Sequence, residues 1–157
     1  MSYASTCPAA IAALIAAFGR SADLAGVLVT DGLPVGDQTA ADEAVIVGYT
    51  EADSEAAADG TIAAEGEAGN RDREKYAIHC AAGVRNSDPE QGAAARTRAF
   101  ALFGGCGQAI AADRSLGSTV LTAALGAWSL SAEHPADVGG IYVRIRFDVD
   151  IDAFTNA

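Results

Sequence analysis

Three aspartates near the C-terminus, Asp148, Asp150 and Asp152, alternate along the chain, and their type and spacing could bind a hard cation. Carboxylates are the ligands that ions such as Ca²⁺ prefer. The segment lacks the glycine and the closing glutamate of a calcium-binding loop. Alternation is also what the solvent-facing side of a β-strand produces. We therefore predict no metal site here and interpret the aspartates as the polar residues of a strand.

The histidines and cysteines do not suggest a catalytic pair. His79 and Cys80 are adjacent, but neighbouring side chains of a strand point to opposite faces, so they cannot act together as base and nucleophile. His134 falls in an expected turn, and Cys7, Cys80 and Cys106 are widely spaced and lack zinc-ligand spacing. We interpret the cysteines as reduced thiols of a cytosolic product. The sequence therefore predicts no catalytic, cofactor-binding or metal-binding residue.

The segment Ile141–Ile151 holds two of these aspartates and shows the strongest pattern in the chain. Apolar residues, all β-branched or aromatic, alternate with polar ones over eleven positions. This period of two indicates a strand with one buried face and one solvent-facing face, as in an antiparallel sheet covered on one side. The expected solvent-facing residues are Tyr142, Arg144, Arg146, Asp148 and Asp150.

Four further strands and two helices are expected around this strand. The strands are Val27–Val29, Ala44–Tyr49, Arg73–Val84 and Thr119–Leu130. The first helix covers residues 7–18, with Ser5 or Thr6 as its cap and Pro8 in its first turn. The second starts at the capping-box pair Ser87 and Glu90 and ends near residues 113–117. The order favours a single α+β domain over residues 1–157, a two-layer sandwich of a mixed or antiparallel sheet with both helices on one face.

An acidic insertion at about residues 50–72 lacks both helical and strand periodicity. Residues 50–70 hold six acids among alanine and glycine: Glu51, Asp53, Glu55, Asp59, Glu65 and Glu67. We expect a flexible solvated loop, or a ribbon that becomes ordered only against a partner.

The charge of the whole chain is strongly acidic. The net charge is −11, and residues 1–70 account for −10 of it, with eleven acids and one arginine. Specific nucleic-acid binding requires a basic face, so this balance argues against it. No apolar run is long enough to span a membrane, and the N-terminus lacks the basic start of a signal peptide.

Several diffuse motifs spread over nearly the whole chain resemble one protein family. They are the turn at residues 31–36, Val45–Tyr49, Arg73–Ile78, the alanine- and arginine-rich stretch at residues 94–100, and Gly139–Gly140 before the alternating strand. Together they are similar to the tail terminator (minor tail) proteins of long-tailed bacteriophages, particularly those of phages that infect actinobacteria. The family has no invariant site motif that could be transferred to this chain residue by residue.

The resemblance implies a structural virion protein. Its members form a homo-hexameric ring, cap the tail tube protein, stop tube polymerisation and offer a surface to the head–tail connector protein. The resemblance implies no cofactor, no enzymatic activity and no membrane. It places the protein at the head-proximal end of the tail, after assembly in the host cytoplasm, with DNA passing through the ring.

Two sets of residues are candidate contact sites under this hypothesis. The first is expected to line the lumen, where carboxylates would repel DNA, or to contact the tube or connector. It comprises Glu51, Asp53, Glu55, Glu65 and Glu67. The second is expected between subunits and comprises Trp128, Arg144, Arg146, Asp148 and Asp150. The alternative for Trp128 is a core residue.

Two alternatives remain open from the sequence. The first is another head–tail connector or tail-completion protein, which only ring stoichiometry and partner identity would distinguish. The second is a small cytosolic α+β enzyme. A deep pocket that holds His79, His134 or a cysteine with a strongly perturbed pKa would favour it.

Overall fold

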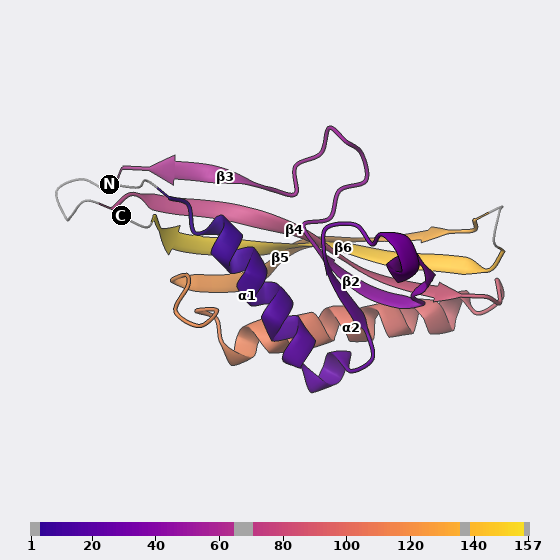
Figure 1. The fold of residues 1–157 in the computed structure, drawn as a ribbon. Helices are drawn as coiled ribbons and strands as arrows, with labels where there is room; N and C mark the ends of the chain where they lie inside the picture. The colour runs from indigo at the N-terminus through magenta and orange to yellow at the C-terminus, as the bar shows by residue number, and fades with distance from the viewer. Residues whose placement is uncertain (1–3, 65–70, 136–138, 156–157) are drawn as a thin grey trace.

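The fold is seen in a computed structural model that describes residues 4–64, 71–135 and 139–155 (Figure 1). In these residues the chain forms a six-stranded mixed sheet, and two helices, α1 (Cys7–Arg20) and α2 (Gly92–Ala112), pack on one of its faces. The main hydrophobic core lies between the helices and the sheet, and a smaller cluster comprises Ile46, Tyr49 and Ala81. The predicted α+β two-layer architecture is confirmed.

The sheet is built around its two longest strands, β4 (Arg73–Asn86) and β6 (Ile141–Phe154). Its order is β1 (Leu28–Asp31), β2 (Glu43–Val47), β4, β6 and β5 (Thr122–Glu133). The pair β1–β2 is parallel, and the other pairs are antiparallel. A further strand, β3 (Ala58–Ala63), pairs with the N-terminal half of β4. The strand order leaves β1 and β5 at the two ends of the sheet.

Strand β6 has the register that its alternation predicts. Val143, Ile145, Phe147 and Val149 are all at most 2% exposed and face the helices. Strand β4 contributes its own alternate residues to the same core, among them Ile78. Because these strands bury one face along their whole length, a shift of one residue would move every apolar side chain into solvent. The strand continues three residues beyond the predicted end, to Phe154.

Helix α1 begins where expected, but a different residue satisfies its N-terminus. Thr6 is the N-cap and makes no side-chain capping bond of its own. Instead, the carboxylate of Glu74 on β4, only 2% exposed, accepts hydrogen bonds from the Thr6 N–H (2.6 Å) and the Ser5 hydroxyl (2.8 Å). A carboxylate at a helix N-terminus is favourable, because it meets free N–H groups and the positive end of the helix dipole. The sheet therefore anchors the helix.

Helix α2 begins later than predicted. The prediction that Ser87 and Glu90 form its capping box is therefore wrong. Strand β4 runs on to Asn86, and residues 87–91 form a turn instead of a first helical turn. The Asn86 side chain accepts from the Asp88 N–H (3.0 Å), and Asp88 accepts from the Glu90 N–H (2.9 Å). Short polar side chains favour such local turns as readily as helix caps. The helix starts at Gly92 and ends at Ala112, close to the predicted end.

The acidic insertion is not wholly irregular, which corrects the expectation of a loop. Residues 58–63 form β3, which lies along the edge of β4 (Figure 1). Five of its six residues are exposed on both faces. A strand without a buried face has no alternating hydrophobic pattern, so periodicity could not reveal it.

Strand β5 has a bulge that explains its ambiguous sequence pattern. Leu125 is in register with Val149, and Trp128 is in register with Phe147. Three residues of β5 therefore span two residues of β6, as at a β-bulge. The extra residue breaks the alternation, and the strand covers residues 122–133 instead of the predicted 119–130.

No helix in the part of the chain that the structure describes is long and apolar enough to cross a membrane.

Candidate interaction surfaces

The open face of the sheet, opposite the helices, carries the polar residues of β6. The predicted solvent-facing position of Arg144 is wrong, because this residue is only 9% exposed. The segment that follows β2 folds back over the sheet and covers it. Arg146 and Asp148 are half-buried on the same face, whereas Asp150 is exposed.

An ion-pair network joins this covering segment to β6. Arg144 pairs with Glu51 and more weakly with Glu133 (Nη2–Oε1 3.4 Å). Arg146 bridges Glu51 (Nη1–Oε2 3.0 Å) and Glu55 (Nη2–Oε2 3.2 Å). Glu55 also accepts a hydrogen bond from the Glu51 N–H, which together with Arg146 lowers the pKa of its carboxyl. Residues predicted to face a lumen and residues predicted between subunits therefore pair with one another inside one chain.

Two tyrosines complete this arginine–tyrosine cluster, which we define as Tyr49, Tyr142, Arg144, Arg146 and Glu51. The Arg144 guanidinium carbon lies 5.3 Å from the ring centre of Tyr49 and 5.7 Å from that of Tyr142. Arg146 lies 5.4 Å from the Tyr49 ring. These separations suit cation–π attraction. Burial raises the pKa of Tyr49 to about 12 despite the neighbouring arginines, so its hydroxyl stays neutral.

A glycine makes room for this cluster. A Cβ atom at Gly83 on β4 would collide with the Tyr142 hydroxyl. Glycine at this position therefore lets the Tyr142 ring lie across the neighbouring strand. The cluster acts as a clamp that fixes residues 49–55 to the open face.

His79 links three strands on the same open face. Its Nδ1 lies 2.6 Å from Asp148 on β6, and its Nε2 lies 2.8 Å from Asp59 on β3. Partial burial alone would lower the pKa of His79, but the hydrogen bonds to both carboxylates outweigh burial and raise the pKa. Asp148, predicted between subunits, thus has a partner within the chain.

Two of the three thiols, Cys80 and Cys106, are buried in the core, and Cys7 is half-buried at its border. Cys80 points away from His79, as the strand geometry requires, and burial raises its pKa to about 12. Burial also raises the pKa of Cys106. Thiols with raised pKa values carry little thiolate and are poor nucleophiles.

His134 is exposed just past the end of β5. Among the described residues, no three His, Cys, Asp or Glu side chains are grouped so that they could hold a metal ion.

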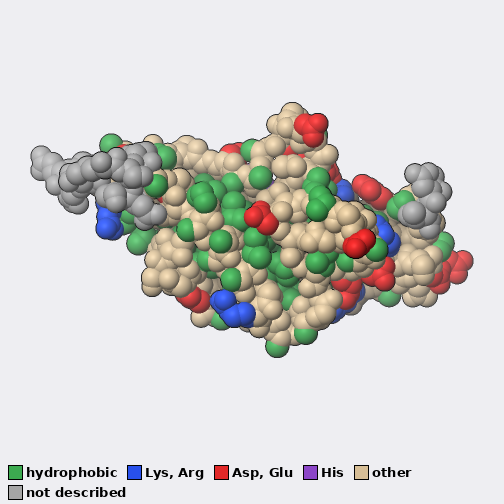
Figure 2. All heavy atoms as spheres, viewed as in Figure 1, with side chains coloured by type: hydrophobic (Ala, Val, Ile, Leu, Met, Phe, Trp, Pro, Cys, Tyr) green, Lys and Arg blue, Asp and Glu red, His purple; other side chains and the backbone are tan. Residues whose placement is uncertain are grey.

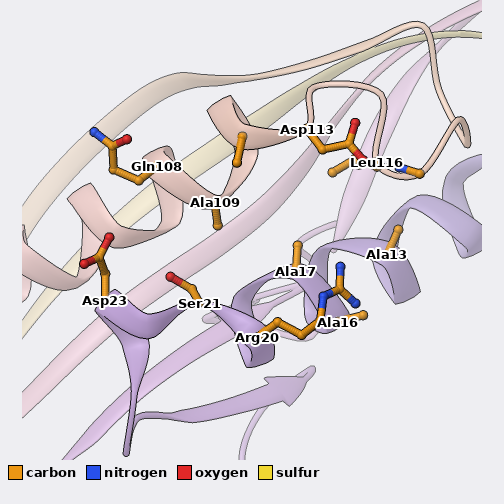
Figure 3. Close-up of a pocket in the computed structure, with 12 residues that line it drawn as sticks. Ala13, Ala16, Ala17, Arg20, Ser21, Asp23, Gln108, Ala109, Asp113 and Leu116 are labelled. Atoms are coloured by element: carbon orange, nitrogen blue, oxygen red, sulfur yellow. Dashed lines mark hydrogen bonds between the residues drawn. The ribbon is translucent and has the colours of Figure 1, made fainter.

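A groove of about 560 Å³ runs between the two helices (Figure 3). Alanines of both helices, such as Ala13, Ala17 and Ala109, form its walls, and the charged groups of Arg20 and Asp113 stand at its rim. The space-filling view of the same helix-bearing side shows hydrophobic side chains scattered among uncharged atoms, with charged groups between them (Figure 2).

An aromatic cluster emerges at the outer edge of β5. We call it the β5 edge and define it as Trp128 and Leu130 of β5 with Phe100 and Phe103 of α2. Trp128 is 54% exposed and Leu130 is 40% exposed. Trp128 packs edge-on against Phe100 (centroids 5.4 Å apart) and lies 6.2 Å from Phe103, which in turn packs on buried Phe147 (5.2 Å). No strand in the described part of the chain pairs with the outer side of β5.

The predicted contact residues thus have different environments. Trp128 lies at an open edge, while Arg144, Arg146 and Asp148 are engaged internally. Asp53 is exposed on the covering segment, and Glu65 and Glu67 lie outside the described residues. Tyr49 and Glu133 also belong to the network but were not predicted from the sequence. Opposite charges on β6 and in the acidic insertion were the signal that could have paired these segments.

No protein-family model matches the chain, and no curated protein is significantly similar to it in sequence. Its function is therefore inferred from the surfaces described above and from the resemblance in the sequence motifs.

Proposed function

We propose that this chain is the subunit of a ring at the head-proximal end of a long phage tail. The ring is a homo-hexamer that caps the tail tube protein, stops tube polymerisation and presents a surface to the head–tail connector protein. It is part of the virion and is assembled in the host cytoplasm. The motif resemblance and the two-layer fold support this proposal.

The observation that carries the proposal is the open, apolar β5 edge. A long strand with unpaired backbone groups and an exposed tryptophan is a site that another chain can cover. Aromatic residues are enriched at the centres of protein interfaces. Because the cluster extends the core through Phe103 and Phe147, covering it would continue an existing apolar layer.

The acidic charge supports a position around a DNA path. A lining rich in carboxylates repels a polyanion, whereas a basic lining would bind it through counterion release. Within the covering segment, Glu51 and Glu55 already pair with arginines. In the predicted lumen set, Asp53 therefore differs from Glu51 and Glu55. Its residue is exposed, and its carboxylate forms no ion pair with any residue that the structure describes.

The test measures assembly in the presence of the expected partner. Purified protein is added to polymerising tail tube protein of a long-tailed phage, and tube length is followed by electron microscopy. We expect six-fold rings at tube ends, shorter tubes at higher ring concentrations and co-sedimentation of the two proteins. Unchanged tube growth together with no co-sedimentation would contradict the proposal. Rings that bind a connector protein and ignore tubes would instead identify another head–tail connector.

The enzyme alternative gains no support from the described geometry. Cys80 and Cys106 are buried with raised pKa values. His79 is held by two carboxylates and faces away from both thiols.

A further inference from the structure

The segment between β2 and β3 projects from the sheet as a loop (Figure 1). Both of its ends are fixed to one residue of β4. The Tyr49 N–H donates to the carbonyl of His79 (2.7 Å), and the His79 N–H donates to the carbonyl of Ala57 (2.9 Å). We call the residues between these two anchors, residues 50–56, the flap. Compact surface loops whose ends lie together in this way are frequently functional.

The flap has internal hydrogen bonds of its own. The Glu51 N–H donates to the Glu55 carboxylate (2.6 Å), and the Glu55 N–H donates to the Ala52 carbonyl (3.0 Å). These bonds join residues within the flap and do not depend on its contact with the sheet. Because both anchors lie at the same place on β4, the flap can move about them as one body.

Ion pairs hold the flap against the open face. Glu51 pairs with both Arg144 and Arg146, and Glu55 pairs with Arg146. Among the described residues, none of the flap belongs to either hydrophobic cluster, and most flap residues are exposed. Salt screens exposed ion pairs, and segments with few apolar contacts open at a lower free-energy cost than core strands. The flap therefore has the contacts of a segment that lifts while the strands beneath it stay paired.

The flap covers two cations that it satisfies only in part. Without the flap, Arg146 would lose its described ion pairs, and Arg144 would keep Glu133 at 3.4 Å. Even with the flap in place, the buried Nε–H of Arg144 has no hydrogen-bond partner among the described residues. A buried donor without an acceptor lowers stability. An occupant with a further acceptor at this point would gain that hydrogen bond.

These cations stand beside an aromatic ring that stays in place when the flap lifts. We define Arg144, Arg146 and Tyr49 as the arginine seat. Tyr49 is 5% exposed, and the guanidinium carbons of the two arginines lie 5.3 and 5.4 Å from its ring centre. Tyr49 lies outside the flap and is bonded to β4, so lifting the flap leaves the seat assembled. Guanidinium groups offer paired N–H donors that match the two oxygens of a carboxylate.

We infer that the flap is a releasable occupant of the arginine seat, and that an acidic segment of a partner protein takes its place. The seat already binds the carboxylates of Glu51 and Glu55, so it fits a partner segment with acids at the same spacing. The phosphates of a nucleic acid would also meet the arginines, but the net charge of −11 repels a long polyanion. The closed flap thus inhibits the seat until a partner displaces it. The seat and the flap define this occupant independently of the proposed place in a phage tail.

Hydrogen exchange followed by mass spectrometry tests whether the flap opens by itself. Raising NaCl from about 0.1 M to about 1 M shortens the Debye length from about 10 Å to about 3 Å, and flap exchange in the full chain should become at least about threefold faster. Exchange in β4 and β6 is expected to stay slow. Glu51→Gln should accelerate flap exchange already at the lower salt concentration. Asp53→Asn is the matched control on the same flap, because Asp53 forms no ion pair with any described residue. Equal effects of the two variants, or a flap that exchanges only together with β4, would reject the opening.

A peptide with the sequence of the flap tests the seat in trans. The probe is the acetylated and amidated peptide of residues 50–56, Thr-Glu-Ala-Asp-Ser-Glu-Ala. Its binding to the full chain is measured by titration calorimetry. The double variant Glu51→Gln/Glu55→Gln is expected to bind it at least about tenfold more tightly than the wild type, because the wild-type flap competes at an effective concentration in the millimolar range. No binding to the double variant at about 5 mM peptide, or equal binding to both proteins, would overturn the inference.

Two further substitutions separate the seat from a general attraction between charges. Arg146→Ser, added to the double variant, is expected to weaken peptide binding at least about tenfold. Arg96→Ser is the matched control, because Arg96 is an exposed arginine of α2, in the other layer, and it should leave binding unchanged. A peptide with glutamine in place of both glutamates should not bind. Peptide binding that survives Arg146→Ser would reject the seat. A single-stranded oligonucleotide that binds more tightly than the peptide would reject an acidic protein segment as the occupant.

Discussion

The open face and the β5 edge both contain residues expected between subunits. They differ in how far the rest of the same chain covers these residues or forms ion pairs with them. On the open face, Arg144 is 9% exposed and pairs with Glu51 and Glu133. At the β5 edge, Trp128 is 54% exposed and meets other aromatic rings on one side only. Among the described residues, the arginines of the open face find acidic partners in the same chain, although the buried Nε–H of Arg144 has no hydrogen-bond partner, whereas the apolar edge leaves Trp128 largely exposed.

This difference shows which kind of residue is the better guide to an interface. Long charged side chains on a strand can find partners in any nearby acidic segment of their own chain, as Arg144 and Arg146 do. An exposed tryptophan on an edge strand cannot be covered in this way by its own chain once the neighbouring helix has packed against it. Disrupting the charged surface should therefore mainly lower stability, whereas disrupting the apolar edge should mainly affect assembly.

The largest effect is expected from a charge in the shared core. Phe147→Asp places a carboxylate at a position that is 2% exposed, beneath Phe103. A buried unpaired charge costs several kcal/mol, so we expect a loss of more than about 4 kcal/mol and an unfolded or aggregated product. Urea unfolding followed by circular dichroism measures it. A soluble variant with a cooperative transition like that of the wild type would show that the β6 register is wrong.

Removal of the clamp comes next. Arg144→Ala leaves Glu51 without its buried partner and removes the cation between two tyrosine rings. Breaking a largely buried pair costs about 3–5 kcal/mol; because Glu51 is partly exposed, we expect about 2–3 kcal/mol. Arg146→Ser is the matched control on the same face, where partial exposure limits the loss to less than about 1 kcal/mol. Equal losses for the two variants would contradict the distinction between a buried and a half-exposed arginine.

A smaller, pH-dependent effect is expected from His79. Its pKa is raised in the folded state by Asp148 and Asp59, so the charged imidazole stabilises the fold below the unfolded value of 6.5. This contribution is lost as pH rises through the higher folded pKa. We therefore expect urea unfolding to show stability falling as pH rises above about 6.5 and through the raised folded pKa, and His79→Gln to flatten that dependence. A variant with the full wild-type slope would assign the effect to other groups.

Some parts of the fold could be predicted because their pattern coincides with their burial. The alternation of β6 follows from one buried and one covered face, and the apolar run of β2 follows from its position between β1 and β4. Strand β3 could not be predicted, because its exposed residues carry no hydrophobic pattern. The start of α2 was missed because Asp88 and Asn86 use their side chains in a turn.

The candidate sites were harder to predict for a similar reason. Alternation assigns a side chain to a face of the sheet but does not show what covers that face. Arg144 was correctly assigned to the face opposite the core, yet Tyr49 and Glu51 lie over it only because the chain folds back after β2. Trp128 could be assigned to neither core nor interface, because the bulge after Leu125 interrupts the pattern that would have fixed its face.

The smallest effect on stability is expected from a substitution at Asp53. Such a variant can therefore test function separately from folding. Replacing the whole acidic set by lysine would confuse two effects, because Glu51→Lys and Glu55→Lys would put cations against Arg144 and Arg146 and release the clamp. Asp53 is exposed on the same segment and makes no ion pair with any described residue, so Asp53→Lys is expected to leave the urea midpoint unchanged. If this carboxylate faces the DNA path or a tail partner, the variant placed in an infectious phage should slow DNA ejection or impair head joining. Asp53→Asn, which removes the charge without reversing it, should have a weaker effect. Normal tail length, head joining and ejection in a stably folded Asp53→Lys phage would show that this part of the segment serves neither purpose, and would leave the β5 edge as the principal functional surface.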